Sequence, residues 1–403
     1  MREHILITGG AGFIGSNFIE YFLEKYKNYH LINLDLLTYA GDLGNLNGIL
    51  DNKRHKFIKG DICNRELVEF IFKEYNIMGV IHFAAQTHVD NSIKSPNIFI
   101  KTNINGTQNL LECAKNHWLK SPFYTKEKYK NARFHHISTD EVYGSLGKKG
   151  SFSETSPYKP NSPYSASKAG SDMLVRAYNK TFGLNTIITN CSNNYGPKQH
   201  DEKLIPTIIK NAINKQPIPI YGDGKNVRDW LYVKDHCKGI DLAYHNGKIG
   251  QTYNIGGECE KRNIDIAKMI CKMLDRLLPK SDKSSYINQI KFVQDRYGHD
   301  KRYAIDSTKI ASEMGFRING NLKENLHTTI NYFLNKYMGG GSSKNRIPTF
   351  RFALFALFKP FVAFLSSFAT FTQDSNRLDS KNPLLLFIDY FPFLNLRLIG
   401  GGK

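Results

Sequence analysis

The 403-residue chain has six cysteines, and none of them stands in a pattern that indicates a disulfide framework or a zinc site. They are spread along the chain without a C-x-x-C pair or a Cys/His cluster at zinc-ligand spacing: Cys63, Cys113, Cys191, Cys237, Cys259 and Cys271. Scattered cysteines are typical of a protein from a reducing compartment. We therefore expect no structural metal and no disulfides. At ~100–200 residues per domain, the length predicts two or three units whose cores need no covalent support.

Targeting signals are also missing. Residues 1–15 run directly into a strand-like segment and lack the apolar region and cleavage site of a signal peptide. The longest uncharged run of the last 66 residues, residues 360–373, is shorter than the ~20 residues that a membrane-spanning helix needs. The sequence therefore predicts a cytoplasmic protein without a transmembrane helix.

Acidic residues are scarce relative to basic ones: 36 Asp and Glu stand against 55 Lys and Arg, which gives a formal net charge of +19. Such an excess indicates a nucleic-acid surface, a membrane surface or an anionic small-molecule ligand. Nucleic-acid binding usually concentrates the charge, whereas here it is spread along the chain and clusters mildly only in residues 115–130, which resemble an exposed loop. We therefore expect a small anionic ligand and no nucleic acid.

The last 66 residues differ in composition from the rest. Residues 338–403 open with a Gly/Ser linker and hold 11 of the 26 phenylalanines, with eight Lys or Arg and three Asp or Glu. Phenylalanine recurs at every third position across residues 352–364, beside basic residues, which leaves an interfacial membrane helix open. The alternative is an appended segment that is not part of the enzyme fold, and this is the interpretation that we favour.

The first half of the chain predicts a dinucleotide-binding unit. The short apolar run of residues 4–8 leads into Gly9, Gly12 and Gly15 and then into a helical pattern over residues 13–26. Such glycines permit a tight turn, a close approach of the backbone to a pyrophosphate, and close packing of helix on strand. Asp35 follows Gly15 by twenty residues, where a carboxylate accepts hydrogen bonds from the adenosine ribose and favours NAD over NADP.

Strands and helices continue to alternate after this unit. We expect strands over residues 57–58, 80–83 and 134–138 and helices over residues 67–75 and 97–115, with Ala84 and Ala85 as small residues at a strand end. This alternation predicts a Rossmann-type, doubly wound parallel sheet. Further short strands over 217–220, 230–233, 252–255 and 290–293 predict a smaller C-terminal α/β domain. The expected division is residues 1–192 mainly for the cofactor, 193–337 mainly for the substrate, with interleaved segments, and 338–403 as linker and tail.

Candidate catalytic residues follow the strand of residues 134–138. Thr139, Asp140 and Glu141 come directly after it, and Tyr164 and Lys168 stand one helical turn apart further on. A lysine ammonium beside a phenol favours the phenolate, so we expect a lowered tyrosine pKa and a general base. The lysine can also hold the nicotinamide ribose.

Several longer segments of residues 1–337 carry a family resemblance: TGGAGFIGSN, AAQTHVDNSI, STDEVYG, SPYSASKAGSD, NCSNNYGPKQHDEKLIP, YGDGKNVRDWLYVKDH and DRYGHDKRYAID. Together they resemble the extended short-chain dehydrogenase/reductase family, and within it the nucleoside-diphosphate-glucose 4,6-dehydratases, above all the dTDP-glucose type. Epimerases of this family resemble the chain less, because they have a Ser-containing segment in place of Thr139, Asp140 and Glu141.

The resemblance implies a hidden redox cycle on bound NAD. Tyr164 would remove the C4 hydroxyl proton of the sugar, with Thr139 orienting that group, while hydride leaves C4. Glu141 would then abstract the C5 proton, and Asp140 would protonate the departing C6 hydroxyl before hydride returns to C6. One carboxyl group must be ionised and its neighbour protonated, which proximity of like charges encourages.

The resemblance also implies binding residues. The cofactor contacts are Gly9, Gly12, Phe13, Ile14, Gly15, Asp35, Thr38, Asp61, Ile62, Ala84, Ala85, Thr102, Tyr164, Lys168 and Asn194. The nucleotide-sugar contacts are Thr87, Asn193, Lys203, Leu204, Pro219, Tyr221, Arg228, Asn263, Asp295 and His299. Lys203 and Arg228 suit a diphosphate. Three departures from the usual family pattern are Gln86, Asn91 and Tyr297, and Tyr297 opens the choice between dTDP and UDP.

Alternatives of other classes stay open. UDP-glucose is the nearest alternative substrate, and a UDP-sugar epimerase or decarboxylase would share every cofactor residue. A catalytically inactive NAD-sensing protein is disfavoured because all five catalytic candidates are present. By resemblance, the helix that carries Tyr164 and the helix after Pro96 build a homodimer.

Overall fold

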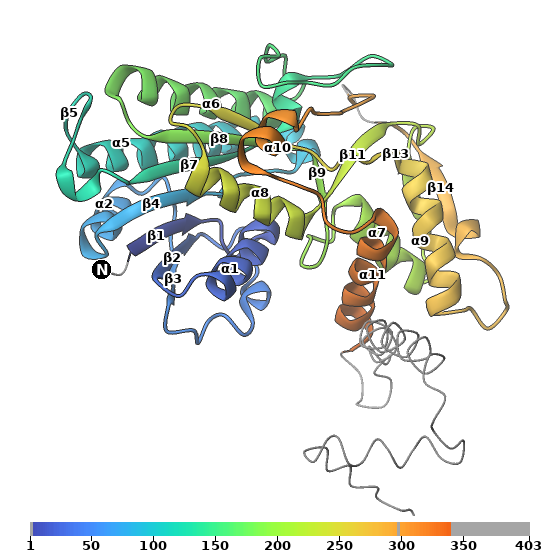
Figure 1. The fold of residues 1–403 in the computed structure, drawn as a ribbon. Helices are drawn as coiled ribbons and strands as arrows, with labels where there is room; N and C mark the ends of the chain where they lie inside the picture. Colours follow the sequence, from blue (N-terminus) through green and yellow to red (C-terminus); the bar gives the residue numbers. More distant parts are fainter. Residues whose placement is uncertain (1–2, 296–298, 340–403) are drawn as a thin grey trace, which may run out of the picture. The chain divides into compact units, whose positions relative to one another are not determined.

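The structure, a computed structural model, describes residues 3–295 and 299–339 (Figure 1). Tyr297 and the predicted tail from residue 340 onward lie outside the described residues. All six cysteines lie within them and are free thiols. Among the described helices, none is both long and apolar enough to cross a membrane.

Within the described ranges, seven parallel strands form one sheet in the order β12-β8-β7-β4-β1-β2-β3. Their bounds are Glu3–Thr8 (β1), Tyr29–Asp35 (β2), His55–Lys59 (β3), Ile77–His82 (β4), Arg133–Thr139 (β7), Thr186–Cys191 (β8) and Thr252–Ile255 (β12). Helices Phe13–Lys25 (α1), Arg65–Glu74 (α2), Thr107–Trp118 (α5), Pro163–Phe182 (α6) and Val233–Asn246 (α8) cover the sheet. The doubly wound sheet predicted from the sequence is therefore confirmed.

The two faces of the sheet bury separate apolar clusters. Ile5 and Ile7 of β1 pack in a cluster with α1 and α8, whereas Leu6 between them packs in a second cluster with α2, α5 and α6. Figure 1 shows these two helical layers on opposite sides of the sheet. Successive side chains of a strand point to opposite faces, so an unbroken apolar strand such as β1 can serve both layers.

The order of the strands defines the place of a ligand site. From β1 the chain continues through β2 and β3 toward one edge of the sheet and then returns to β4 on the other side of β1. In open parallel sheets, a crevice forms where the order reverses, at the carboxyl ends of the strands. The segments that leave those ends are residues 9–12 after β1, residues 83–88 after β4, and the short 3-10 helix Asp140–Tyr143 (η4) after β7.

A smaller part of the chain is built mainly from residues after 192. Its strands are Asn193–Tyr195 (β9), Ile218–Tyr221 (β10), Val227–Tyr232 (β11), Glu260–Arg262 (β13) and Ile290–Val293 (β14), and its helices are Leu204–Ile213 (α7), Asn263–Leu277 (α9) and Leu322–Met338 (α11). β10 pairs with β14, and β11 lies between β9 and β13. In contrast, β12 joins the large sheet beside β8. The chain thus crosses between the two parts more than once.

The remaining elements are short. They are Leu43–Leu46 (η1), Val89–Lys94 (α3), Pro96–Phe99 (α4), Ile100–Gly106 (η2), Leu119–Ser121 (β5), Tyr124–Thr125 (β6), Glu127–Tyr129 (η3), Tyr286–Gln289 (η5) and Thr308–Met314 (α10). Residues 115–130, expected as a loop, comprise the end of α5, the β5–β6 hairpin and η3.

The helix predicted over residues 97–115 is interrupted, because η2 is a π-helical segment between α4 and α5. Within it, the Asn103 side chain turns toward the segment after β4, accepting a hydrogen bond from the Gln86 N–H (2.8 Å) and donating to the Gln86 carbonyl (3.1 Å). Wide helical turns commonly occur where a side chain is redirected to a site. This one fixes the backbone of the loop that follows β4.

Candidate active site

The glycines at and just after the turn between β1 and α1 stand where a side chain would not fit. Gly9 has φ +73°, and a Cβ there would lie 2.6 Å from the backbone nitrogen of Ala84, while a Cβ on Gly15 would lie 2.4 Å from the carbonyl oxygen of Gly9. Gly12 precedes the first turn of α1, which contains no acidic residue. Free N–H groups and the positive end of the helix dipole therefore face the crevice, an arrangement that suits a pyrophosphate.

Asp35 connects this turn to the next loop. Its carboxylate, at the end of β2 and 8% exposed, accepts hydrogen bonds from the N–H groups of Ala11 (2.9 Å) and Leu37 (2.8 Å). Burial raises the pKa of Asp35, and the two backbone hydrogen bonds oppose that rise. The side chain is thus fixed where the sequence pattern places a ribose partner.

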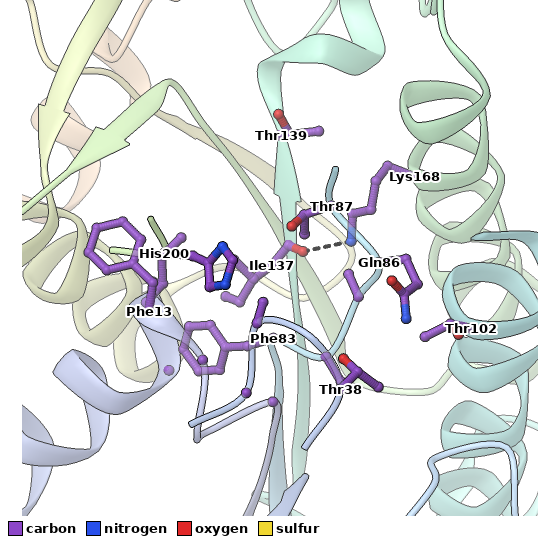
Figure 2. Close-up of a pocket in the computed structure, with 18 of the residues that line it drawn as sticks. Phe13, Thr38, Phe83, Gln86, Thr87, Thr102, Ile137, Thr139, Lys168 and His200 are labelled. Carbon is purple, nitrogen blue, oxygen red and sulfur yellow. Dashed lines mark hydrogen bonds between the residues drawn. The ribbon is translucent and has the colours of Figure 1, made fainter. Parts of the chain in front are cut away.

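The crevice is a pocket that brings together most of the predicted site. All five catalytic candidates and all fifteen predicted cofactor residues line it, as do Thr87, Asn193 and Lys203 from the predicted substrate set. Figure 2 shows Phe13, Phe83 and His200 on one side of this pocket and Gln86, Thr102 and Lys168 on the other. The structure thus gathers residues that lie far apart in the sequence.

Two carboxyl groups stand at the end of β7. Asp140 is 1% exposed, and its Oδ2 has no hydrogen-bond partner among the described residues. Burial raises the pKa of Asp140 well above its ordinary value, and the neighbouring charges of Glu141 and Asp229 raise it further. The hydroxyl of Thr139 accepts a hydrogen bond from the Glu141 N–H (3.3 Å). The structure therefore places a buried carboxyl group with a raised pKa directly beside a second carboxyl group.

The expected effect of Lys168 on Tyr164 is wrong. Burial raises the pKa of Tyr164 well above its ordinary value, and the charge of Glu141 adds to the rise. The Lys168 ammonium instead donates a hydrogen bond to the carbonyl oxygen of Ile137 (2.9 Å), drawn as a dashed line in Figure 2. Helical spacing places both residues on one face of α6, but the lysine head group turns toward β7. Tyr164 is a neutral phenol in this arrangement.

Seven predicted substrate residues do not line the pocket: Leu204, Pro219, Tyr221, Arg228, Asn263, Asp295 and His299. Tyr221, Asp295 and His299 gather at the carboxyl ends of β10 and β14, where the rings of Tyr221 and His299 lie 6.4 Å apart. The His299 ring nitrogen lies 2.6 Å from the Asp295 carboxylate. These three residues form a group of their own in the smaller part of the chain.

The Arg228 side chain is engaged within the protein. It is 7% exposed, it donates hydrogen bonds to the carbonyl oxygens of Val227 (2.8 Å) and Asp300 (2.9 Å), and it lies 4.5 Å from the centre of the Tyr303 ring. Its charge opposes the rise in the pKa of Asp140. Arg228 therefore lies near the catalytic carboxyl groups, and both of its terminal nitrogens already donate to backbone carbonyl groups.

Sequence reasoning did not single out Glu202 or His200, although both line the pocket. Burial alone would raise the pKa of Glu202, but the hydrogen bond from His200 and the charges of Lys203 and His88 outweigh it and lower that pKa. The His88 ring nitrogen lies 3.4 Å from the Glu202 carboxylate. Both residues lie in the segment NCSNNYGPKQHDEKLIP, which also contains the predicted substrate residue Lys203. Their position next to Lys203 is the sequence feature that could have identified them.

A glycine turn at the strand-order reversal, together with acid and base side chains at the end of a central strand, defines a Rossmann-fold enzyme of the short-chain dehydrogenase type. The chain belongs to the family described as GDP-mannose 4,6 dehydratase, whose profile matches residues 6–329. The family resemblance inferred from the sequence is thus confirmed.

Individual relatives agree with this assignment. The chain is 48% identical over 330 residues to a dTDP-glucose 4,6-dehydratase of Xanthomonas campestris pv. campestris, covering 82% of this chain and 92% of the relative. It is similar to the crystal structure of a dTDP-glucose 4,6-dehydratase from Bacillus anthracis in complex with NAD, at 43% identity and a TM-score of 0.73, over 83% of this chain and 98% of the other. A Streptomyces venezuelae enzyme of the same name, also with NAD bound, gives 40% identity, a TM-score of 0.75, and coverage of 84% and 98%.

Proposed function

We propose that this chain binds NAD tightly and dehydrates dTDP-glucose to dTDP-4-keto-6-deoxyglucose. The observation that carries the proposal is the buried Asp140, whose pKa is raised, beside Glu141 in the pocket that also holds Tyr164 and Lys168. An elimination of water needs a group that gives a proton to the leaving hydroxyl and a group that removes the proton from the adjacent carbon. The names of the relatives support the same reaction.

The residues of the pocket fit NAD. The glycine turn admits a pyrophosphate at the start of α1, and the Asp35 carboxylate suits two free ribose hydroxyls but repels a 2′-phosphate. When bound, NAD supplies the acceptor and later the donor of one hydride. Because that hydride leaves C4 of the sugar and returns at C6, the reaction needs no external oxidant.

Tyr164 and Thr139 act on the C4 hydroxyl in this proposal. Tyr164 accepts the proton of that hydroxyl as the hydride leaves, and Thr139 orients the oxygen. The phenol must give up its own proton first, and its raised pKa opposes this. A positive charge brought to the pocket with the oxidised cofactor would lower that cost, and the hydrogen bond with Thr139 also acts to lower the pKa of Tyr164.

Asp140 and Glu141 then remove water from C5 and C6. The C4 ketone acidifies the C5 hydrogen, so the Glu141 carboxylate can take it as a proton. Asp140 gives its proton to the C6 hydroxyl, the C6–O bond breaks, and water leaves with a C5=C6 double bond behind it. Hydride addition at C6 and protonation at C5 complete the 4-keto-6-deoxy sugar.

The nucleotide sugar is proposed to lie between the two parts of the chain. Residues 1–192 hold mainly the cofactor, and residues 193–337 hold mainly the substrate, with Thr87, Asn193 and Lys203 in the pocket itself. We assign the base to the group formed by Tyr221, Asp295 and His299, whose mutual contacts support this assignment. Lys203 remains a candidate for the diphosphate, since its side chain is 39% exposed.

A homodimer is part of the proposal. The helices expected to form its interface carry exposed apolar side chains, namely Ile98 of α4, Ile100 of η2 and Met173 of α6, each 43–50% exposed. Sedimentation equilibrium of the full chain, with Met173→Lys as the disrupting variant, measures this directly.

Cytoplasmic location and the role of residues 338–403 stay predictions. A liposome co-sedimentation that disappears when the chain ends at Tyr337 would support membrane contact by the tail.

The activity is tested by incubating the purified chain in parallel with dTDP-glucose, UDP-glucose and UDP-galactose. We expect the absorbance of a 4-keto-6-deoxy product from dTDP-glucose and a much slower reaction of UDP-glucose. Faster dehydration of UDP-glucose would move the assignment to that nucleotide. Epimerisation of UDP-galactose without any 4-keto product would refute the dehydratase proposal, and absence of all three activities with NAD bound would favour a sensing protein.

A further inference from the structure

Behind the pocket, a buried row of polar side chains starts at Lys168. Lys168 and Asp172 are one turn apart on α6, and one ring nitrogen of His136, on the neighbouring strand β7, lies near both of them. His136 Nε2 is 3.3 Å from the Lys168 Nζ and 3.2 Å from the Asp172 Oδ1. All three residues are less than 5% exposed. Lys168 lines the pocket, whereas the other two lie behind it.

The far carboxylate oxygen is held in place by hydroxyl groups. Asp172 Oδ2 accepts hydrogen bonds from the Ser138 hydroxyl (2.8 Å) and from the Tyr158 hydroxyl (3.0 Å). These contacts fix the carboxylate toward the His136 ring. A buried carboxylate with two such donors is built to stay in one orientation, and it costs free energy unless a positive charge compensates it.

The His136 ring is suited to separate the two charges. Burial and the charge of Lys168 lower the pKa of His136 well below its ordinary value, so the ring is neutral and carries one N–H. Its Nδ1 is buried without a partner among the described residues, so Nε2 is the atom that meets both neighbours. Because all three residues are buried, the ammonium and the carboxylate interact through protein of low dielectric constant.

Other titratable groups around Lys168 do not provide this compensation. His82 of β4 is buried, and its pKa is lowered far below its ordinary value. Burial raises the pKa of Cys191 on β8 and of Tyr164 on α6, and that of Tyr143 beside Asp172. Each of these groups is neutral near pH 7. Asp172 is therefore the negative charge available to Lys168 within this cluster.

The pKa values of Lys168 and Asp172 are both shifted in the direction that favours the neutral form, as burial requires. Burial lowers the pKa of Lys168 to about 8, although the charge of Asp172 opposes this, and burial raises the pKa of Asp172 to about 6. Between these values the lysine carries its proton and the aspartate is ionised. Without the aspartate, the opposing contribution is lost and the lysine releases its proton at a lower pH.

We propose that Asp172, acting across His136, is a positioning residue that keeps Lys168 protonated and thereby sets the upper pH limit at which the site works. Lys168 acts through its charge on a ribose hydroxyl of the bound cofactor, and Asp172 does not touch that group. Its role is to provide the counter-charge that a lysine buried to this degree otherwise lacks.

The direct test is a titration of Lys168 in the full chain without added cofactor or substrate. The protein is labelled with [6-13C]lysine, and Lys168→Met assigns the resonance. We expect a transition near pH 8 in the parent and one at least about one pH unit lower in Asp172→Asn, a tenfold smaller protonated fraction above both values. Asp172→Ser removes the same charge and must shift the transition in the same direction. An unchanged transition in both variants would overturn the proposal.

Two control variants separate charge from packing. Tyr158→Phe removes a hydrogen bond to Asp172 but leaves its charge, so the transition stays near pH 8. Asp235→Asn removes an equally buried carboxyl group that pairs with Lys238 of α8 and does not line the pocket. A shift in either control as large as in Asp172→Asn would also overturn the proposal.

A kinetic readout follows if the proposed dehydratase activity is present. The alkaline limb of the kcat profile moves down by the same one unit in Asp172→Asn, while KM at pH 6.5 changes less than about threefold. This part rests on the proposed function. The titration does not, so a failure of the dehydratase assignment and a failure of the Asp172 proposal give different results.

Discussion

Replacing Asp140 by Asn tests whether this group is the acid of the elimination. The exchange keeps the size and the neutral state of the side chain and removes only the proton that can be given away. The carboxyl group is 1% exposed, and burial and the neighbouring charge of Glu141 raise its pKa, which favours the protonated form. General acid catalysis contributes about 10²–10⁴-fold, which corresponds to about 3–5 kcal/mol of activation free energy. We therefore expect kcat to fall by that factor with KM within about threefold.

The assay follows two steps separately. Product formation from dTDP-glucose reports the whole reaction, and exchange of the C5 hydrogen of recovered substrate in deuterium oxide reports the proton removal proposed for Glu141. In Asp140→Asn, exchange continues while product formation is slow. The variant Asp235→Asn, which removes an equally buried carboxyl group outside the pocket, keeps kcat within about twofold. A kcat of Asp140→Asn within tenfold of the parent would refute the role of Asp140.

The same variant makes a prediction about stability. The pKa of Asp140 is raised in the folded protein above the ordinary 3.8 of the unfolded chain. The folded state therefore binds this proton more tightly, and the stabilisation is fully present below about pH 4 and is lost as the pH rises through the folded-state pKa. Asparagine cannot titrate, so that part of the pH dependence of the free energy of unfolding is absent in the variant. Urea unfolding at several pH values measures the difference.

Two further predictions concern the cofactor turn and the loop before α7. Gly15→Ala places a Cβ 2.4 Å from the Gly9 carbonyl oxygen. We therefore expect about 1–3 kcal/mol lower stability in thermal unfolding and at least tenfold weaker NAD binding in calorimetric titration. Unchanged NAD affinity would contradict the glycine-turn assignment. Tyr337→Phe removes the hydroxyl that donates a hydrogen bond to the Asp201 carboxylate (2.7 Å), which directly precedes Glu202. Steady-state kinetics should then give a several-fold higher KM for the nucleotide sugar, and the free energy of unfolding should fall by about 1–2 kcal/mol. An unchanged KM would show that α11 does not fix this loop.

The sequence predicted best what depends on short stretches of chain. The run of residues 4–8, the glycines after it and Asp35 at the end of the next strand are local patterns, and the structure places each at the expected edge of the sheet. Thr139, Asp140 and Glu141 reach the same pocket because parallel strands of one sheet end at the same edge. Neither result required knowledge of a distant contact.

Contacts between distant residues explain what could not be predicted. Helical spacing placed Lys168 beside Tyr164, but the lysine hydrogen bonds to Ile137, 31 positions earlier. Arg228, expected to bind a diphosphate, donates a hydrogen bond to the carbonyl oxygen of Asp300, 72 positions later. Such partners depend on which strands pair and which loops meet, and no local pattern encodes them. The π-helical turn of η2 could not be predicted for the same reason, because its Asn103 hydrogen bonds to Gln86 in the segment after β4.

Burial moves the acid and the lysine of this site in opposite directions, and the fold treats them differently. At Asp140, the neighbouring charge of Glu141 acts in the same direction as desolvation, so both keep the proton on a group that must give it away. At Lys168, desolvation works against the charged form, and only an opposing negative charge such as Asp172 can preserve it. An acid therefore needs no partner here beyond a like charge, whereas the lysine needs a counter-charge behind it. The proposed row from Lys168 through His136 to Asp172 meets that need without placing a further carboxylate in the pocket, where it would repel the diphosphates of cofactor and substrate.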